Sequence, residues 1–486
     1  MSEHAKRRGG ALARIAVWVL APALALAVAL AGLLWLQREK IQLGAETYLF
    51  GLPLVLMDLT RAEFAGQQPS SDPLRRVRQP PKAAFREVVR PTVDLLYTSA
   101  FIDLDAGPWV LRLPANPEHF EVFSVLGAWT DVFAAPGTRT HGAAGGTYLV
   151  AGPGWQGQGP AGMTLLRGDT RMAWMIGRTQ LRGPQDLPAV HKLQDGISLL
   201  PLPAVGVPPT STTSETSAIA NTPRPAPAPE GKGAGAGDKV TAKGEPPLAQ
   251  LRQMSARDFF QRLSALMVDN PPRAADRPMV MKLERLGVAP GRAPAWNWLD
   301  DRSVALGRWL ADFQVRRELA KPRNTVQGWQ TPPDLLGRYG TAYNIRAAVA
   351  LVGLGANLPE DAIYPSARVD GEGKALNGAQ RYRIRFLPGQ LPPARAFWSV
   401  TAYGADDFLL DVPEGRHAVG SREPLAVNAD GSVDLLVQAD PPPPALRANW
   451  LPVRAGEAFQ LTARLYWPEE AALQGRWHMP AIERVR

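Results

Sequence analysis

Acidic, aromatic and basic side chains that could form a binding or catalytic site cluster on or beside predicted strands between residues 90 and 140. They are Asp94, Tyr97, Asp103, Trp129, Asp131 and Arg139. Paired carboxylates beside an aromatic platform can bind a sugar or act as general acid and base. The alternative is structural: Asp131 would form an ion pair with Arg139, and Asp94 would accept hydrogen bonds from the backbone of a turn.

A second candidate site lies near the C-terminus. Asn449 and Trp450 follow a proline run and precede Leu451-Pro452, so they predict a rigid loop at the mouth of a β-sandwich. Loops held on rigid scaffolds often carry binding sites. Trp398 and Tyr403 are further binding candidates, because aromatic side chains can stack on a ligand, although packing in the core is the alternative use of large aromatic residues.

Motifs for metals, cofactors and nucleophilic catalysis are missing from the sequence. There is no cysteine, and none of the six histidines is paired at the spacing of a helical metal motif. Gly152–Gly157 matches a dinucleotide fingerprint formally, but Gln158-Gly159-Pro160 follows where a helix would have to begin. No phosphate loop or nucleophile elbow occurs. We therefore predict no cofactor and no metal, although a site assembled in three dimensions stays open.

Charge and composition narrow the possible partners. The 486 residues carry a formal net charge of +9, but no dense basic run with interleaved aromatic residues occurs. We therefore predict that the protein does not bind nucleic acid. Attraction to anionic lipid or to a polyanionic glycan remains an option. The oligomeric state is not indicated by the sequence.

An apolar segment near the N-terminus predicts a membrane anchor. Ile15–Leu36 is an uncharged run of 22 residues, long enough as a helix to span roughly 33 Å of hydrocarbon. A basic tail, residues 1–14, precedes it and should stay in the cytoplasm, which would leave the body of the chain in the periplasm. A cleaved signal peptide is the alternative, but its apolar region is usually shorter, at about 7–15 residues. The predicted localisation is the bacterial inner membrane, with a single pass.

The rest of the chain divides by composition into four parts. Residues 41–202 predict a helix and arm followed by a β-sandwich, because short apolar runs alternate there with Gly and Pro turns. Residues 203–247 contain no aromatic residue and predict a disordered linker. Residues 248–352 predict a helical module in which Ser255 caps a helix, and residues 353–486 predict a second sandwich or jelly roll.

Several stretches resemble two uncharacterised families that occur together. The N-terminal stretches are Arg90–Ala100, Ala128–Phe133, Gly137–Thr140, Gly152–Trp155 and Ile176–Gln180. The C-terminal stretches are Gly353–Asn357, Ala362–Pro365, Leu387–Pro393, Ala396–Thr401 with Tyr403, Asn428–Ser432, Asn449–Pro452 and Arg464–Pro468. The first set resembles domain of unknown function 1254, and the second resembles domain of unknown function 1214.

The resemblance implies an immunoglobulin-like sandwich, a small helical domain and a C-terminal jelly-roll-like sandwich, which agrees with the mainly β pattern above. It implies no biochemical activity. At the first signature, Thr92, Leu95 and Thr98 replace residues that are usually Asn, Thr and Ser in relatives, while Asp94 and Tyr97 remain. A site on this strand would therefore be less polar here.

Two functional hypotheses follow. The first is a membrane-anchored, periplasm-facing protein that binds an envelope ligand, which is a glycan, a lipid or a protein. The alternative is an envelope hydrolase or a metal-dependent enzyme with a site at or between the two β domains. A purely structural envelope subunit is a third, weaker possibility.

Overall fold

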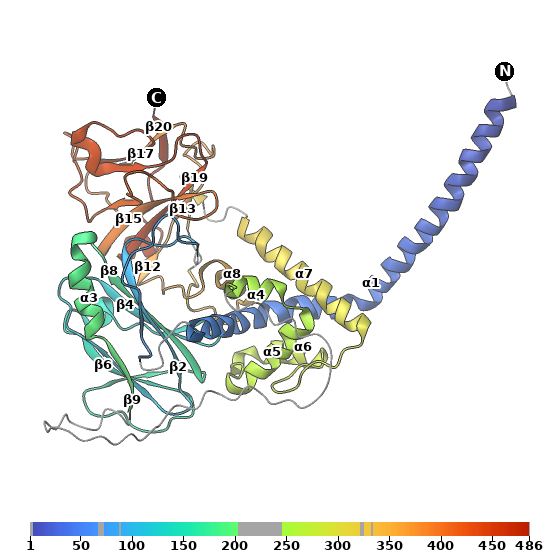
Figure 1. Ribbon diagram of the computed structural model, residues 1–486, viewed down its shortest axis with the longest axis horizontal. Helices are drawn as coiled ribbons and strands as arrows, with labels where there is room; N and C mark the ends of the chain where they lie inside the picture. The colour runs from blue at the N-terminus through green and yellow to red at the C-terminus, as the bar shows by residue number, and fades with distance from the viewer. Residues whose placement is uncertain are drawn as a thin grey trace.

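The computed structural model describes residues 3–66, 72–86, 89–202, 245–320, 325–331 and 334–485, except for the side chains of residues 3–21, 318 and 320. Paired, sandwich-like β-sheets form most of the body, and helices lie against them (Figure 1). A mainly β chain with a helical module is thereby confirmed. The predicted linker, residues 203–247, falls almost entirely outside the described residues.

The N-terminal sandwich consists of two sheets. The first sheet has the order β1-β2-β8-β4-β5, and the second has the order β7-β6-β3-β9. The strands are β1 Arg75–Arg76, β2 Leu95–Asp103, β3 Trp109–Leu113, β4 Glu121–Gly127, β5 Val132–Ala134, β6 Gly146–Ala151, β7 Thr164–Arg167, β8 Met172–Gln180 and β9 Ser198–Pro201; the helices are α2 Thr138–His141 and α3 Leu187–Gly196. Alternate residues of β2, such as Ala100 and Ile102, enter the core between the sheets, while Leu95 and Tyr97 face the helices.

The helices surround the second half of α1, Glu3–Gly66. Leu43–Leu59 contains most of the buried residues of this helix, and they belong to the largest apolar core of the protein. The helices packed around α1 are α4 Pro247–Gln253, α5 Ala256–Asp269, α6 Arg277–Arg285, α7 Trp298–Ala320 and α8 Tyr343–Gly353. As predicted, Ser255 caps α5, since its hydroxyl accepts a hydrogen bond from the backbone N–H of Asp258.

Glycines allow α1 and α7 to cross closely. A Cβ atom at Gly307 would lie 2.1 Å from the carbonyl oxygen of Ile41, and one at Gly44 would lie 3.0 Å from the backbone of Val304. Lys40 and Asp300 form an ion pair at the same crossing. Any side chain at position 307 would push the two helices apart.

The C-terminal sandwich also has two sheets. One has the order β10-β11-β13-β19-β15-β16 with β12 paired to β19, and the other has the order β18-β17-β14-β20. The strands are β10 Thr325–Val326, β11 Trp329–Gln330, β12 Ala362–Ile363, β13 Ser366–Ala367, β14 Arg381–Phe386, β15 Ala394–Gly404, β16 Ala418–Gly420, β17 Val433–Gln438, β18 Trp450–Pro452, β19 Phe459–Pro468 and β20 Ile482–Val485; a short helix, α9 Glu470–Leu473, follows β19. On β19, Leu461, Ala463 and Leu465 enter the sandwich core, so the alternate residues of this strand face outward.

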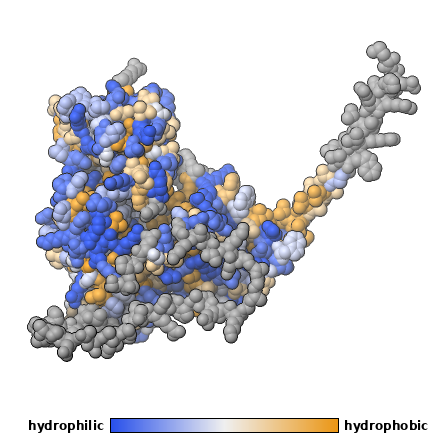
Figure 2. Space-filling model, viewed as in Figure 1, coloured by the Kyte–Doolittle hydropathy of each residue, from blue (hydrophilic) through white to orange (hydrophobic). Residues whose placement is uncertain are grey.

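The first half of α1 projects away from the body (Figure 1), and Figure 2 shows its apolar surface beyond the point where it leaves the body. Leu24, Leu26, Val28, Leu30, Leu33, Leu34, Trp35 and Leu36 are all exposed. A search of the described helices finds none with the length and apolar character needed to cross a membrane. The predicted span, Ile15–Leu36, begins in residues 15–21, whose side chains lie outside the described part of the chain.

We predict that Gly307→Ala destabilises the protein, because the new methyl group would collide with the backbone of α1. Overpacking of this kind costs about 1–3 kcal/mol in free energy of unfolding, measured by urea denaturation. Gly66→Ala, in the last turn of α1, is the control, because no atom of the described residues would lie within 4 Å of the new methyl group. It should be neutral or stabilise by up to about 1 kcal/mol. Equal stability of the two variants would contradict the close crossing.

Candidate functional site

A cavity of about 1020 Å³ lies where the two sandwiches and the helices meet. Its walls come from β2 and β8 of the N-terminal sandwich, from α1, α7 and α8, and from β11, β13 and β19 of the C-terminal sandwich. The outer faces of two sheets therefore face each other across it, and helices contribute a further part of its lining.

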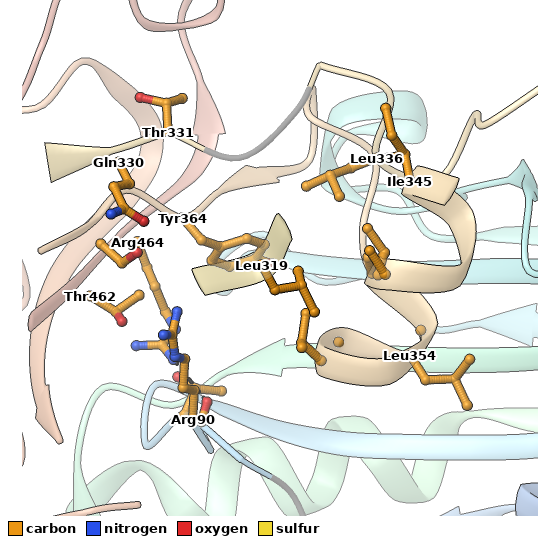
Figure 3. Close-up of a pocket in the computed structure, with 18 of the residues that line it drawn as sticks. Arg90, Leu319, Gln330, Thr331, Leu336, Ile345, Leu354, Tyr364, Thr462 and Arg464 are labelled. Atoms are coloured by element: carbon orange, nitrogen blue, oxygen red, sulfur yellow. Dashed lines mark hydrogen bonds between the residues drawn. The ribbon is translucent and has the colours of Figure 1, made fainter. Parts of the chain in front are cut away.

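One end of the cavity is apolar (Figure 3). Ile345, Ala348, Val349 and Val352 line it from α8. Their spacing places them on a single face of the helix, whereas Arg346, Ala347 and Ala350 are buried on the other side. Further apolar lining residues are Leu49, Leu95, Val315, Leu319, Leu336 and Leu354.

The other end is polar and positively charged. Thr462, Arg464 and Tyr466 alternate along β19, so all three side chains lie on its outer face toward the cavity. Figure 3 places Thr462, Arg464, Tyr364 and Gln330 together at this end, apart from Leu336, Ile345 and Leu354.

Arg464 is held in place by a set of hydrogen bonds. Its guanidinium group donates to the hydroxyl of Thr401 at 2.9 Å, to the hydroxyl of Tyr403 at 2.6 Å and to the carbonyl oxygen of Arg90 at 3.0 Å. Burial by itself would lower the pKa of Arg464, but Tyr403, Tyr466 and Asp94 outweigh it and raise the pKa above its ordinary value. Arg464 is thus a fixed positive charge.

Arg178 supplies a second buried positive charge. It lies directly opposite Tyr97 in the β2–β8 pairing, and its guanidinium carbon is 5.7 Å from the centre of the Tyr97 ring. It donates a hydrogen bond to the carbonyl oxygen of Gly355 at 2.5 Å. Gly355 has a positive φ of 84°, and a Cβ atom there would lie 2.4 Å from Ile176, so only glycine fits this turn.

Neutral hydroxyl groups surround the two arginines. Burial raises the pKa of Tyr364 and raises that of Tyr466 well above the ordinary value, so both phenols keep their protons. Tyr364 accepts a hydrogen bond from the amide of Asn357 at 2.7 Å. The hydroxyl of Thr462 is buried without a hydrogen-bond partner among the described residues. The described residues that line this end therefore include donors and no carboxylate. The carboxylate of Asp94 lies close by, 3.2 Å from the hydroxyl of Thr92 and 3.5 Å from that of Tyr466.

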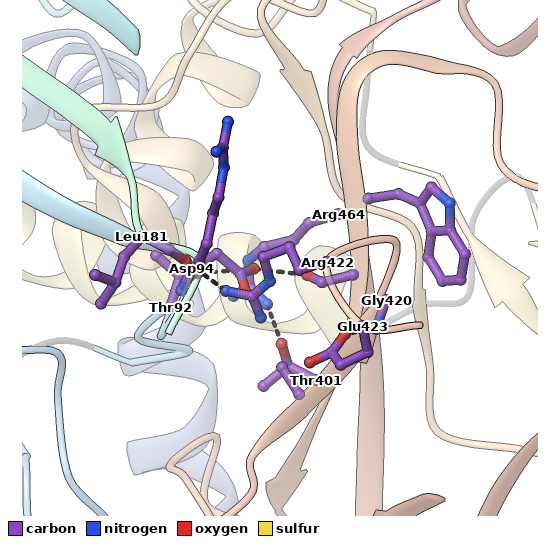
Figure 4. A network of polar contacts seen from close by, with 12 residues as sticks. Thr92, Asp94, Leu181, Thr401, Gly420, Arg422, Glu423 and Arg464 are labelled. Atoms are coloured by element: carbon purple, nitrogen blue, oxygen red, sulfur yellow. Dashed lines mark hydrogen bonds and ion pairs between the residues drawn. The ribbon is translucent and has the colours of Figure 1, made fainter. Parts of the chain in front are cut away.

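Asp94, the first of the predicted site residues, does not line the cavity; it is fully buried within a network of polar contacts (Figure 4). Its carboxylate forms an ion pair with Arg422 at 2.7 Å and accepts a hydrogen bond from the hydroxyl of Ser399 at 2.6 Å. Thr92 also donates to it, at 3.2 Å. Because Arg422 and Ser399 belong to the C-terminal sandwich, Asp94 joins the two β domains and is not placed to act as an acid or base on a ligand in the cavity.

The other predicted acidic residues do not reach the cavity. Asp103 forms an exposed ion pair with Arg171, at 2.8 Å. Partial burial alone would raise the pKa of Asp103, but the hydrogen bonds from Arg171 and from the backbone of Asp105 outweigh it and lower the pKa. The expected pair of Asp131 and Arg139 is wrong. Asp131 pairs instead with Arg273 at 2.9 Å, and burial raises its pKa. Arg139 pairs with Asp361 at 2.7 Å.

The predicted aromatic and loop candidates are core residues. Asn449 ends the short helix η4, Pro444–Asn449, and is buried with its amide bonded to the backbone of Ala426 and Asp434. Trp450 is buried and donates to the carbonyl oxygen of Gln438 at 2.9 Å. In place of the predicted rigid loop, the chain here forms η4 and β18. Trp129 and Trp398 are also buried, and Tyr403 is buried behind Arg464, donating to the carbonyl oxygen of Pro91 at 2.7 Å.

Tyr97 is thus the one predicted site residue that lines the cavity. The residues that sequence reasoning missed are Arg90, Arg178, Tyr364, Thr462, Arg464 and Tyr466. Five of these lie inside the stretches that carry the family resemblance, and Thr462 precedes the last stretch by two positions. The alternation of Gln460, Thr462, Arg464 and Tyr466 with the apolar residues Leu461, Ala463 and Leu465 was the available signal for one face of the site.

Comparison with known proteins confirms both family resemblances. Residues 73–201 match the family model described as protein of unknown function DUF1254, and residues 361–470 match that of protein of unknown function DUF1214. No curated protein sequence matches this chain.

Two solved structures are similar to the chain. The VPA0106 protein from Vibrio parahaemolyticus is 21% identical, with a TM-score of 0.66, over 92% of this chain and 100% of that one. A putative uncharacterized protein from Burkholderia cenocepacia is 12% identical, with a TM-score of 0.43, over 94% of this chain and 98% of that one. The first likeness supports the fold alone.

We predict that Asp94→Asn destabilises the protein strongly, since it leaves Arg422 buried without its counter-ion. Breaking a buried ion pair from one side costs about 3–5 kcal/mol, measured as free energy of unfolding. Asp103→Asn is the matched control, because the pair with Arg171 is exposed and such pairs contribute about 0–1 kcal/mol. A loss at Asp94 no larger than that at Asp103 would rule out Asp94 as the main link between the β domains.

Proposed function

We propose that this protein binds an amphiphilic ligand of the cell envelope in the cavity between its two β domains. The observation that carries the proposal is the division of one cavity into an apolar end, formed largely by α8, and a polar end, formed by β8 and β19. A lipid matches this division better than a glycan or a protein segment does.

The size and lining of the cavity support a small-molecule ligand. Ligand pockets typically measure about 300–1,000 Å³ and are mostly apolar, with a few polar groups that fix the orientation of the ligand. The volume of about 1020 Å³ is at the upper end of this range. A sugar would leave the apolar face of α8 without a partner, whereas a hydrocarbon chain would cover it.

We further propose that the N-terminal segment attaches the protein to the inner membrane and that the body faces the periplasm. The exposed side chains from Leu24 to Leu36 support attachment, because leucines in such a row are costly to keep in water. The basic residues before them, including Lys6 and Arg7, favour a cytoplasmic N-terminus.

We predict that Ala348→Trp abolishes binding of a fluorescent fatty-chain probe, because the indole would fill the cavity along the inner face of α8. Val427→Trp, at an exposed position away from the cavity, is the control and should leave probe binding unchanged. Probe titration measures the effect, and native mass spectrometry identifies any lipid that co-purifies. Wild-type protein that binds neither probe nor lipid would sink the proposal.

We predict that removal of residues 1–36 transfers the protein from the membrane fraction to the soluble fraction of expressing cells, and that the truncated protein still binds the probe. Cell fractionation followed by probe titration measures both effects. A truncated protein that stays with the membrane would show that the apolar segment is not the attachment.

A further inference from the structure

We infer that the ligand carries an oxyanion, a carboxylate or a phosphate, and that Arg178, Arg464 and Thr462 bind it at the polar end of the cavity. This inference rests on the proposed function and specifies the chemical class of the ligand: an acidic amphiphile rather than a neutral one.

The charges that line the cavity have a single sign. Arg90, Arg178, Arg317 and Arg464 are among the described lining residues, which include no Asp or Glu. Positive charges in a partly dry cavity attract an anion more strongly than they would in water, because the effective dielectric constant there is lower. Arg90 has its counter-ion in Asp407, at 2.7 Å, and Arg317 is exposed on α7. The charges that an anion in the cavity would compensate are therefore those of Arg178 and Arg464.

Arg178 is the strongest single indication. Its side chain is buried, and it forms no ion pair with a described residue. Its charge acts on the carboxylate of Asp361, but that carboxylate is paired with Arg139. Its Nη1 atom reaches only the hydroxyl of Ser124 and the carbonyl oxygen of Ile176, both at 3.5 Å, the outer limit of a hydrogen bond. A buried charge without a counter-ion is costly, and such a charge is normally paired. Two other arginines near the contact between the β domains do have such a partner: Arg422 pairs with Asp94, and Arg139 pairs with Asp361.

Thr462 provides an independent indication. Its hydroxyl is buried, lines the cavity and has no hydrogen-bond partner among the described residues. An unsatisfied buried polar group is rare in a folded protein and is normally completed by water or a ligand. As a donor next to Arg464 on the same face of β19, this hydroxyl suits an oxyanion.

The position of these groups sets the orientation of the ligand. Thr462 and Arg464 lie at the end of the cavity opposite Leu336, Ile345 and Leu354 (Figure 3). An acid group bound there would leave its hydrocarbon chain along the apolar face of α8. The cavity would then bind the acid group at its polar end and the hydrocarbon chain at its apolar end.

The test compares four ligands on the full chain in detergent: myristic acid, myristyl phosphate, myristyl alcohol and methyl myristate, each titrated at pH 8. Because hydrogen bonds to a charged group are stronger than neutral ones, the acid and the phosphate should bind roughly 10-fold or more tightly than the alcohol and the ester. Arg178→Gln should weaken binding of the acid and the phosphate by about the same factor and leave alcohol binding unchanged.

Two further variants keep the test decisive. Thr462→Val, which keeps the shape of the side chain and removes its hydroxyl, should weaken acid binding several-fold, by roughly the value of one hydrogen bond. Arg112→Gln, at an exposed position on β3, is the matched control and should change nothing. If Arg178→Gln does not fold, Thr462→Val and the comparison of ligands on the unaltered protein decide.

The possible failures are distinguishable. Equal binding of acid and alcohol by the unaltered protein would overturn the oxyanion inference and leave the proposed lipid-binding function in place. Binding of none of the four ligands would overturn the inference together with the proposed function. If both the Arg178→Gln and the Thr462→Val variants still bound the acid more tightly than the alcohol, by the same factor as the unaltered protein, these residues would not be the ones that bind the oxyanion.

Discussion

The buried carboxylate of Asp94 is the interaction on which the arrangement of the two β domains depends. It is fully buried, and a carboxylate in that position is tolerated only when opposite charge and hydrogen-bond donors surround it. Those partners, Arg422 and Ser399, come from the other domain, more than 300 residues along the chain in each case. Once they are in place, β2 and β19 are held with their outer faces toward each other, and the cavity is the space left between them.

A second constraint is the burial of α1 inside the helical module. Leu49 of α1 lines the cavity, and the close crossing with α7 at Gly307 fixes another wall, since Val315 and Leu319 follow on the same helix. The helix that carries the exposed apolar segment therefore also shapes the cavity. Any movement of the first half of α1 against the body would therefore displace residues that line the apolar end of the cavity.

Much of the local structure was predictable because it follows from short-range patterns. The apolar runs between Gly and Pro turns form the strands of the expected N-terminal sandwich, β3 among them, and Ser255 caps the expected helix. Tertiary contacts decided the rest. Nothing near Asp131 in sequence indicates that its partner is Arg273, 142 positions away, rather than Arg139. The same holds for Asn449 and Trp450: their loop pattern resembles that of an exposed binding loop, and only the packing of β17 and β18 buries them.

Arg178 and Arg464 differ in how many strong hydrogen bonds each makes to the protein. Arg464 donates three hydrogen bonds, to the hydroxyls of Thr401 and Tyr403 and to the carbonyl oxygen of Arg90, so its position does not depend on a ligand. Arg178 makes one short hydrogen bond, to the carbonyl oxygen of Gly355, and its other hydrogen bonds are long, at 3.5 Å. An anion that reaches both arginines would bind the fixed guanidinium of Arg464 and the N–H groups of Arg178 that make only weak hydrogen bonds in the protein. A preorganised group such as Arg464 lowers the entropic cost of binding. The polar end of the cavity is therefore built on the same junction that Asp94 holds together, since β19 carries Arg464 and β15, its neighbour, carries the Ser399 that bonds Asp94.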